Sequence, residues 1–124
     1  MVAMFHKASI FNHPLTNFDT SNVRTMEGMF CEASSFNQAL ANFDTSKVTD
    51  MDWMFMEAFS FNQPLNSFDT SNITTMKEMF KEASSFNQDI FKWDTSKCKN
   101  NMRDMFKGAP TKKADKPKGA RGWF

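Results

Sequence analysis

The sequence predicts a short α/β solenoid made of 25-residue coils, with an all-β solenoid as the alternative. Three observations lead to this fold class: residue types recur at a fixed 25-residue period, helical spacing occurs inside each period, and β-branched residues precede that spacing. Such a period is typical of proteins in which one repeat forms one coil that buries its apolar face only against its neighbours. The most regular positions are Phe11, Phe36, Phe61 and Phe86, then Met26, Met51 and Met76, then Met29, Met54 and Met79.

Each coil contains an apolar stretch that predicts a short helix. In residues 51–58, the apolar residues Met51, Met54, Phe55 and Ala58 follow the spacing i, i+3, i+4, i+7, which is one face of a helix. Val48 stands just before this stretch, and a β-branched residue there favours a short strand. The same column of the repeat holds Val23 and Ile73.

Turn-forming residues bound the predicted helix on both sides. Asp44-Thr45-Ser46 indicates a turn or a helix entry, because these side chains accept hydrogen bonds from free backbone N–H groups. After the helix, Ser84-Ser85 interrupts the pattern, and Pro14 and Pro64 favour an extended segment around Phe-Asn-Gln-Pro-Leu.

The apolar residues are expected to form a core and not a cofactor site. The chain has 15 Phe and 11 Met but no Tyr, and most of the Phe and Met residues lie in a few repeat columns, as packing requires. No cofactor is therefore predicted. Further inward positions are expected at Leu15, Leu40, Leu65 and Ile90, at Phe18, Phe43, Phe68 and Trp93, and at Ala33, Ala58, Ala83 and Ala109.

The repeats define two regions. Residues 1–109 form a repeat unit of about four and a half coils, and residues 110–124 form a basic tail predicted to be disordered. The chain opens in the middle of a coil and shows no signal-peptide pattern, which suggests a fragment of a longer array or an abrupt start. No run of 18 apolar residues occurs, so no membrane-spanning helix is expected.

The repeat motif resembles that of a known family. Ser35-Phe36-Asn37-Gln38, Phe43-Asp44-Thr45-Ser46, Val48-Thr49-Asp50-Met51 and Met54-Phe55 are similar to the 25–26-residue unit of BspA-like leucine-rich-repeat surface proteins. The resemblance spans about residues 1–109. It implies a leucine-rich-repeat-like solenoid on the cell surface or outside the cell, often with a role in adhesion, and it supplies no catalytic motif.

The residues that most enzymes need do not gather in any motif of this sequence. His6 and His13 have no partner set for zinc or for nucleophilic catalysis, and no Ser-His-Asp arrangement stands out from the repeat. The four glycines form no phosphate-binding loop. We therefore predict that the protein is not an enzyme and holds no metal.

Three columns of polar residues could either bind a ligand or form structural hydrogen bonds. The aspartates could form a carboxylate ladder for calcium, or each could accept hydrogen bonds at its own turn, which is preferred. The asparagines are expected to form a structural amide ladder. The threonines could organise ice-like water, although hydrogen bonds in turns are the preferred interpretation. The columns are Asp19, Asp44, Asp69 and Asp94; Asn12, Asn37, Asn62 and Asn87; and Thr20, Thr45, Thr70 and Thr95.

The two cysteines are predicted to be free thiols because they lie in different columns, three coils apart. Cys98 shares its column with Val23, Val48 and Ile73 and is expected to be buried. Cys31 shares its column with His6, Met56, Lys81 and Lys107 and is expected to face outward.

The central coil carries three apolar residues at positions that other coils fill with small or polar residues. Trp53, Met56 and Phe59 stand where other coils have, among others, Glu78, Lys81 and Ser84. We interpret them as a patch for a partner or for self-association. The predicted function is a non-enzymatic repeat module of surface or adhesion type that binds an unknown protein or glycan, and neither nucleic acid nor a membrane span is expected. The alternatives are a structural spacer, or an ice- or calcium-binding array.

Overall fold

The structure, a computed structural model, describes residues 1–120 and contains very little regular secondary structure. Its only helices in this range are two short 3₁₀ helices, η1 (Lys113–Asp115) and η2 (Lys118–Ala120). Over the same residues no strand forms, and the backbone makes only two isolated parallel bridges, which join Thr25 to Asp50 and Asp50 to Thr75. The predicted α/β solenoid is therefore wrong, and the all-β alternative is wrong as well.

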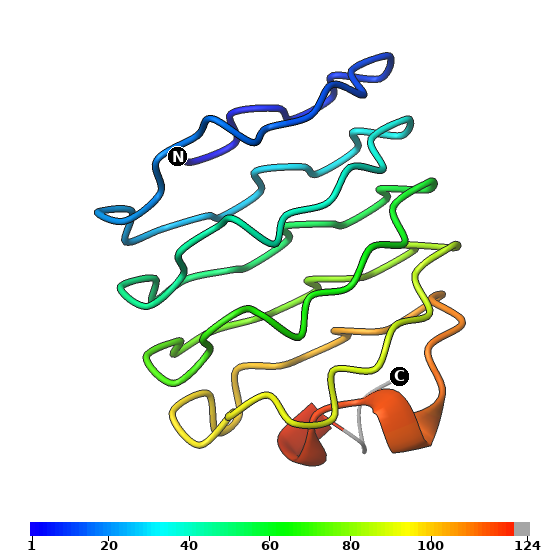
Figure 1. The fold of residues 1–124 in the computed structure, drawn as a ribbon. Coiled ribbons are helices and arrows are strands. Elements are labelled where there is room, and N and C mark those ends of the chain that lie inside the picture. The colour runs from blue at the N-terminus through cyan, green and yellow to red at the C-terminus, as the bar shows by residue number, and fades with distance from the viewer. Residues whose placement is uncertain (121–124) are drawn as a thin grey trace.

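The chain instead forms coils built from turns and irregular segments, and these coils lie side by side from the N-terminal to the C-terminal end (Figure 1). Hydrogen bonds between backbones set the register of neighbouring coils. The N–H of Phe30 donates to the carbonyl oxygen of Met54 at 2.9 Å, and the N–H of Phe55 donates to that of Met79 at 2.9 Å. Equivalent residues of successive coils are thus adjacent in space.

Alternating hydrogen bonds explain why the apolar stretch is not a helix. In residues 51–58, the N–H groups of Trp53, Phe55 and Glu57 donate to carbonyl groups of the next coil. Those of Met54, Met56 and Ala58 close turns by donating to the residue three positions earlier. An α-helix needs every N–H to donate four residues back. Because every second N–H is used between coils, a helix cannot form.

Left-handed backbone conformations recur at two positions in each coil and bend the chain between the turns. Trp53 has φ +59° and Glu57 has φ +57°, and an α-helix excludes such values. Only Gly28 and Gly108 are glycines among these positions. The left-handed conformations could therefore hardly be predicted from the residue types. The two columns are Ala3, Gly28, Trp53, Glu78 and Asp104, and Lys7, Glu32, Glu57, Glu82 and Gly108.

Stacked phenylalanine rings form the centre of the core, as the repeat columns predict. Phe55 lies between its equivalents Phe30 and Phe80, with ring centroids 5.5 and 5.6 Å apart and planes 8° and 2° apart. Phe55 also stacks on Phe61, the ring of the second column in the same coil, at 4.2 Å. The rings therefore form two parallel columns that pack against each other from the first coil to the fourth.

Most of the predicted inward positions are confirmed even though the predicted helix is wrong, but Ala109 is only partly buried. Met51, Met54, Phe55 and Ala58 are each 0% exposed, because consecutive turns place these residues on the same side as a helix would. In the first coil, Phe5, Phe11 and Phe18 are only partly buried.

The last coil contains one additional residue, which shifts the register. The N–H of Met51 donates to the carbonyl oxygen of Thr75, which lies 24 residues further along the chain. The N–H of Met76 donates to the carbonyl oxygen of Asn101, which lies 25 residues further along. Lys99 adopts φ +44° within the insertion, which allows the chain to absorb the extra residue. The column of core methionines then resumes at Met102 and Met105, both buried.

Residues 110–120 differ from the predicted disordered tail, because they fold against the last coil (Figure 1). The Thr111 hydroxyl donates to the carbonyl oxygen of Phe86 at 3.0 Å, and the Ile90 N–H donates to that of Asp115 at 3.0 Å. The Lys116 ammonium lies 5.1 Å from the centroid of the Phe106 ring. This segment satisfies groups that a further coil would otherwise pair. The remaining part of the predicted tail, residues 121–124, lies outside the described residues.

Candidate functional site

The patch predicted from the sequence lies on the turns of the third coil. The N–H of Met56 donates to the carbonyl oxygen of Trp53 at 3.1 Å and closes one turn, while the N–H of Trp53 donates to Lys77 of the next coil at 2.9 Å. The backbone that carries the patch is thus fixed on both sides.

The patch side chains are exposed to different extents. Trp53 is 42% exposed and Phe59 is 47% exposed, whereas Met56 is half-buried. Two large aromatic residues within seven positions therefore present apolar surface that the core does not use. Such surface is what a binding partner would cover.

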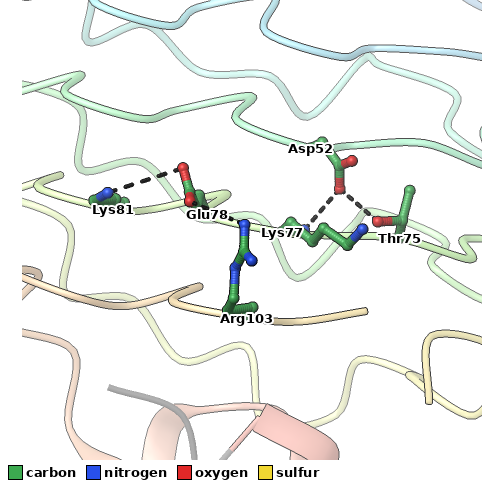
Figure 2. Close-up of polar contacts among 6 residues, drawn as sticks. All are labelled: Asp52, Thr75, Lys77, Glu78, Lys81 and Arg103. Atoms are coloured by element: carbon green, nitrogen blue, oxygen red, sulfur yellow. Dashed lines mark hydrogen bonds and ion pairs between the residues drawn. The ribbon is translucent and has the colours of Figure 1, made fainter. Parts of the chain in front are cut away.

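The fourth coil has charged residues at the positions equivalent to two patch residues, because Glu78 follows Trp53 and Lys81 follows Met56 in their columns. Figure 2 shows that the Asp52 carboxylate accepts a hydrogen bond from the Thr75 hydroxyl at 2.6 Å and one from the Lys77 N–H at 2.7 Å. In the same view, the Glu78 carboxylate lies 4.0 Å from the Lys81 ammonium and 3.7 Å from the Arg103 guanidinium. An apolar centre beside a polar rim is the usual anatomy of a protein interface.

Each carboxylate of the aspartate column accepts hydrogen bonds within its own turn, as the preferred interpretation predicts. In the second coil, the Asp44 carboxylate accepts a hydrogen bond from the Ser46 hydroxyl at 2.6 Å and one from the Ser46 N–H at 3.0 Å. These two bonds hold the pKa of Asp44 below its ordinary value. The same shift with the same leading cause is found at Asp19, Asp69 and Asp94.

The lowered aspartate pKa values predict that stability falls in acid. A carboxyl with a depressed folded-state pKa contributes its full stability above the unfolded value of about 3.9, and loses it as the pH falls through the folded value. We expect a Ser46→Ala, Ser71→Ala variant to be less stable than the wild type at pH 5 and to lose less stability between pH 5 and pH 2. Urea unfolding at the two pH values measures this, and equal losses in both proteins would contradict it.

The asparagine column forms the expected amide ladder between coils. The Asn37 side-chain oxygen accepts a hydrogen bond from the N–H of Asn62 at 2.9 Å and one from the Gln63 amide at 3.1 Å. Asn12 and Asn62 make the equivalent bonds to their next coils. These residues join coils to one another and leave little capacity for a ligand.

The threonine column also joins coils and is not a surface array. Thr20, Thr45 and Thr70 are only 2–3% exposed, and each hydroxyl donates to the carbonyl oxygen of an aspartate in the next coil. The preferred prediction placed these bonds inside one turn, whereas they connect two coils. Hydroxyls that are buried and bonded in this way are not available to order water on a flat face.

The cysteines are free, as predicted, but Cys31 does not face outward. Cys31 is only 6% exposed, and burial, followed by the charges of Glu32 and Glu57, raises the pKa of its thiol to about 11. Cys98 is fully buried, as its column predicts.

The structure also brings together His6, Cys31 and Glu32, a cluster that the sequence analysis missed. The shared column of His6 and Cys31 was the available signal.

A shallow groove of about 530 Å³ runs between the third and fourth coils. Asn66, Gln88 and Asp89 supply polar groups at its walls, while Trp93, which also lines it, is largely buried. The indole N–H of Trp93 donates to the carbonyl oxygen of Leu65 at 3.0 Å, so this ring belongs to the core.

In the described part of the chain, no helix is long and apolar enough to cross a membrane.

Comparison with protein-family models matches residues 1–118 to a family described as "Mycoplasma protein of unknown function, DUF285". No curated protein matches the chain. No solved structure matches it either.

Proposed function

The chain belongs to the Mycoplasma protein family DUF285, and from this premise we propose that it is a non-enzymatic module that binds a protein or glycan partner through Trp53, Met56 and Phe59. The similarity of its repeat motif to that of BspA-like leucine-rich-repeat surface proteins supports a role in adhesion at the cell surface. The alternative, a spacer that supplies only length, requires no exposed aromatic residues.

The observation that carries the proposal is the exposure of the Trp53 side chain at a position where the backbone is left-handed in every coil. Its φ of +59° lies in the left-handed region, where a bulky residue costs about 1–2 kcal/mol relative to its preferred conformation. Gly28 occupies the same position of the second coil and adopts φ +63° without that cost. The Trp53 side chain is 42% exposed, so the core regains only part of its apolar area. Every coil has a left-handed residue at this position, so what distinguishes the third coil is a large, partly exposed aromatic side chain where the others have a small or acidic residue, and such a side chain supports a role in binding.

The other two patch residues also have natural counterparts within the chain. Ser9, Ser34 and Ser84 stand where the third coil has Phe59, and Lys81 and Lys107 stand where it has Met56. Restoring the residues of the other coils would therefore remove the patch without introducing a residue type foreign to the repeat.

We expect a Trp53→Gly, Phe59→Ser variant to keep its fold and to lose partner binding. Its free energy of unfolding should change by less than about 1 kcal/mol, because relief of the left-handed strain offsets lost surface packing. Affinity for a partner should fall at least about tenfold, as expected when aromatic anchors are removed. Glycan arrays and protein arrays identify a partner for the wild-type protein, and surface plasmon resonance compares the variants.

Ile10→Ser is the matched control, because Ile10 is 92% exposed and lies outside the patch. It should bind as the wild type does. If the double variant also binds as the wild type does, or if the wild-type protein binds nothing on either array, the proposed function is wrong. Sedimentation of the same variants tests whether the partner is a second copy of the chain.

A further inference from the structure

A set of metal-binding atoms lies between the first two coils. The Nε2 atom of His6, the Sγ atom of Cys31 and a carboxylate oxygen of Glu32 all lie within 4.8 Å of one another. The Nε2 atom of His6 lies 3.0 Å from the Oε2 atom of Glu32. Three residues from two coils thus point their donor atoms at one small volume.

Backbone hydrogen bonds hold the three residues in place before any ligand arrives. The N–H of Lys7, next to His6, donates to the carbonyl oxygen of Cys31 at 2.9 Å and ties the two coils together at the cluster. The N–H of Glu32 donates to the carbonyl oxygen of Met56 at 2.8 Å and anchors the cluster to the third coil. A site whose ligands are already positioned loses little conformational entropy on binding.

The cluster depends on residues that only this pair of coils supplies. His6 and Cys31 occupy one column, and the remaining coils fill that column with Met56, Lys81 and Lys107. No other group of three histidine, cysteine or acidic residues converges in this way within residues 1–120. The feature is therefore specific to one place in the molecule and is not a by-product of the repeat.

The donor types select the kind of ion. Imidazole nitrogen, thiolate sulfur and carboxylate oxygen are the three ligand types of protein-bound zinc. Calcium and magnesium prefer six or more oxygen ligands, which this cluster does not offer. Cys31 is 6% exposed, while the side chains of His6 and Glu32 are 39% and 36% exposed. An ion can therefore enter from solvent, and water can fill the fourth position of a tetrahedral site.

We propose that His6, Cys31 and Glu32 bind one zinc ion, which joins the first coil to the second. The ion replaces the direct contact between His6 and Glu32 and coordinates Cys31 as a thiolate, and the thiol proton is released to solvent. The core residues Phe5 and Phe11 of the first coil are only partly buried, unlike their equivalents in the second coil. Zinc binding therefore adds a link between the second coil and a coil whose core rings are only partly buried.

The test uses the full chain, reduced with a phosphine and freed of metal. Titration with zinc chloride in a calorimeter should show one ion per chain, and zinc should raise the thermal unfolding midpoint. Cobalt chloride should give visible bands of tetrahedral cobalt together with a near-ultraviolet band from sulfur coordination. Binding of one zinc ion without the sulfur band would overturn the assignment of Cys31.

Two variants remove ligands, and two leave the site intact. His6→Gln and Cys31→Met, the latter introducing the residue of the third coil, should each weaken zinc binding at least about tenfold. His13→Gln and Cys98→Val should bind as the wild type does, because those residues lie outside the cluster. Since the His6 side chain is 39% exposed, its variant is expected to fold, and circular dichroism checks this. The proposal is overturned if the wild-type protein binds no zinc or if His6→Gln binds it equally well.

Discussion

Replacing Phe55 with alanine is expected to lower the free energy of unfolding by about 3–5 kcal/mol, the range for a large aromatic removed from a packed core. Phe55 is 0% exposed and its ring stacks on those of Phe30, Phe61 and Phe80. The lost ring leaves a cavity between rigid neighbours, and two inter-coil contacts weaken at once. In a stack where each coil touches only its neighbours, a defect in the central coil also weakens the coupling between the two ends.

Two alanine variants serve as controls for this prediction. Phe59→Ala changes an exposed ring in the same coil and should cost less than about 1 kcal/mol. Phe5→Ala changes the same column in the first coil, where the ring is only partly buried, and should cost an intermediate amount. Chemical denaturation of the three variants measures the order, and a cost at Phe55 equal to that at Phe59 would show that the ring columns do not hold the coils together.

Replacing Thr45 with valine is expected to cost about 2–4 kcal/mol, although valine has nearly the same shape. The Thr45 hydroxyl donates to the carbonyl oxygen of Asp69 at 3.0 Å and accepts a hydrogen bond from the N–H of Asp69 at 2.8 Å. Thr45 is only 2% exposed, so valine leaves both backbone groups of Asp69 facing an apolar side chain. Each polar group deprived of its partner costs about 1–3 kcal/mol.

The cost at Thr45 should come from the hydroxyl and not from packing. Thr45→Ser keeps the hydroxyl and loses one methyl group, so it should cost only about 1 kcal/mol. Thr49→Val is the second control, because Thr49 is exposed and its hydroxyl donates one longer hydrogen bond, of 3.3 Å, to the carbonyl oxygen of Arg24. Urea unfolding compares the three variants. If Thr45→Val is no more costly than Thr45→Ser, the hydroxyl does not join the coils.

The proposed partner surface and the proposed zinc site are tested independently. Met56 follows His6 and Cys31 in the same column, so the two sites lie on neighbouring coils. Trp53→Gly leaves all three proposed zinc ligands unchanged, and His6→Gln leaves the patch unchanged. Failure of one proposal therefore does not decide the other.

The positions of the core residues could be predicted from the sequence, but the conformation of the backbone could not. The spacing of Met51, Met54, Phe55 and Ala58 correctly identified buried residues, because burial depends on the apolar character of each side chain. The helix inferred from the same spacing was wrong. The carbonyl groups that accept the hydrogen bonds of Trp53 and Phe55 lie 24 residues further along the chain, and no local pattern indicates them.

Of the two candidate sites, the aromatic patch could be predicted from the sequence, whereas the complete metal-binding cluster could not. Trp53 and Phe59 could be recognised from the sequence because they interrupt columns that other coils fill with small or polar residues, and both are exposed in the structure. The cluster of His6, Cys31 and Glu32 could be recognised only in part, because the shared column places His6 and Cys31 on neighbouring coils, whereas the approach of the Glu32 carboxylate depends on side-chain positions in the folded chain.

The sequence by itself determined the 25-residue period, the residues that face the core and the stacking of like upon like, since apolar side chains at equivalent positions gain most by burying one another. Only the tertiary structure decided that the coils are built from turns with left-handed positions, that residues 110–120 cover the last coil, and that Cys31 turns inward beside His6. Each of these depends on backbone groups or side chains of a neighbouring coil, which become available only when the coils have come together.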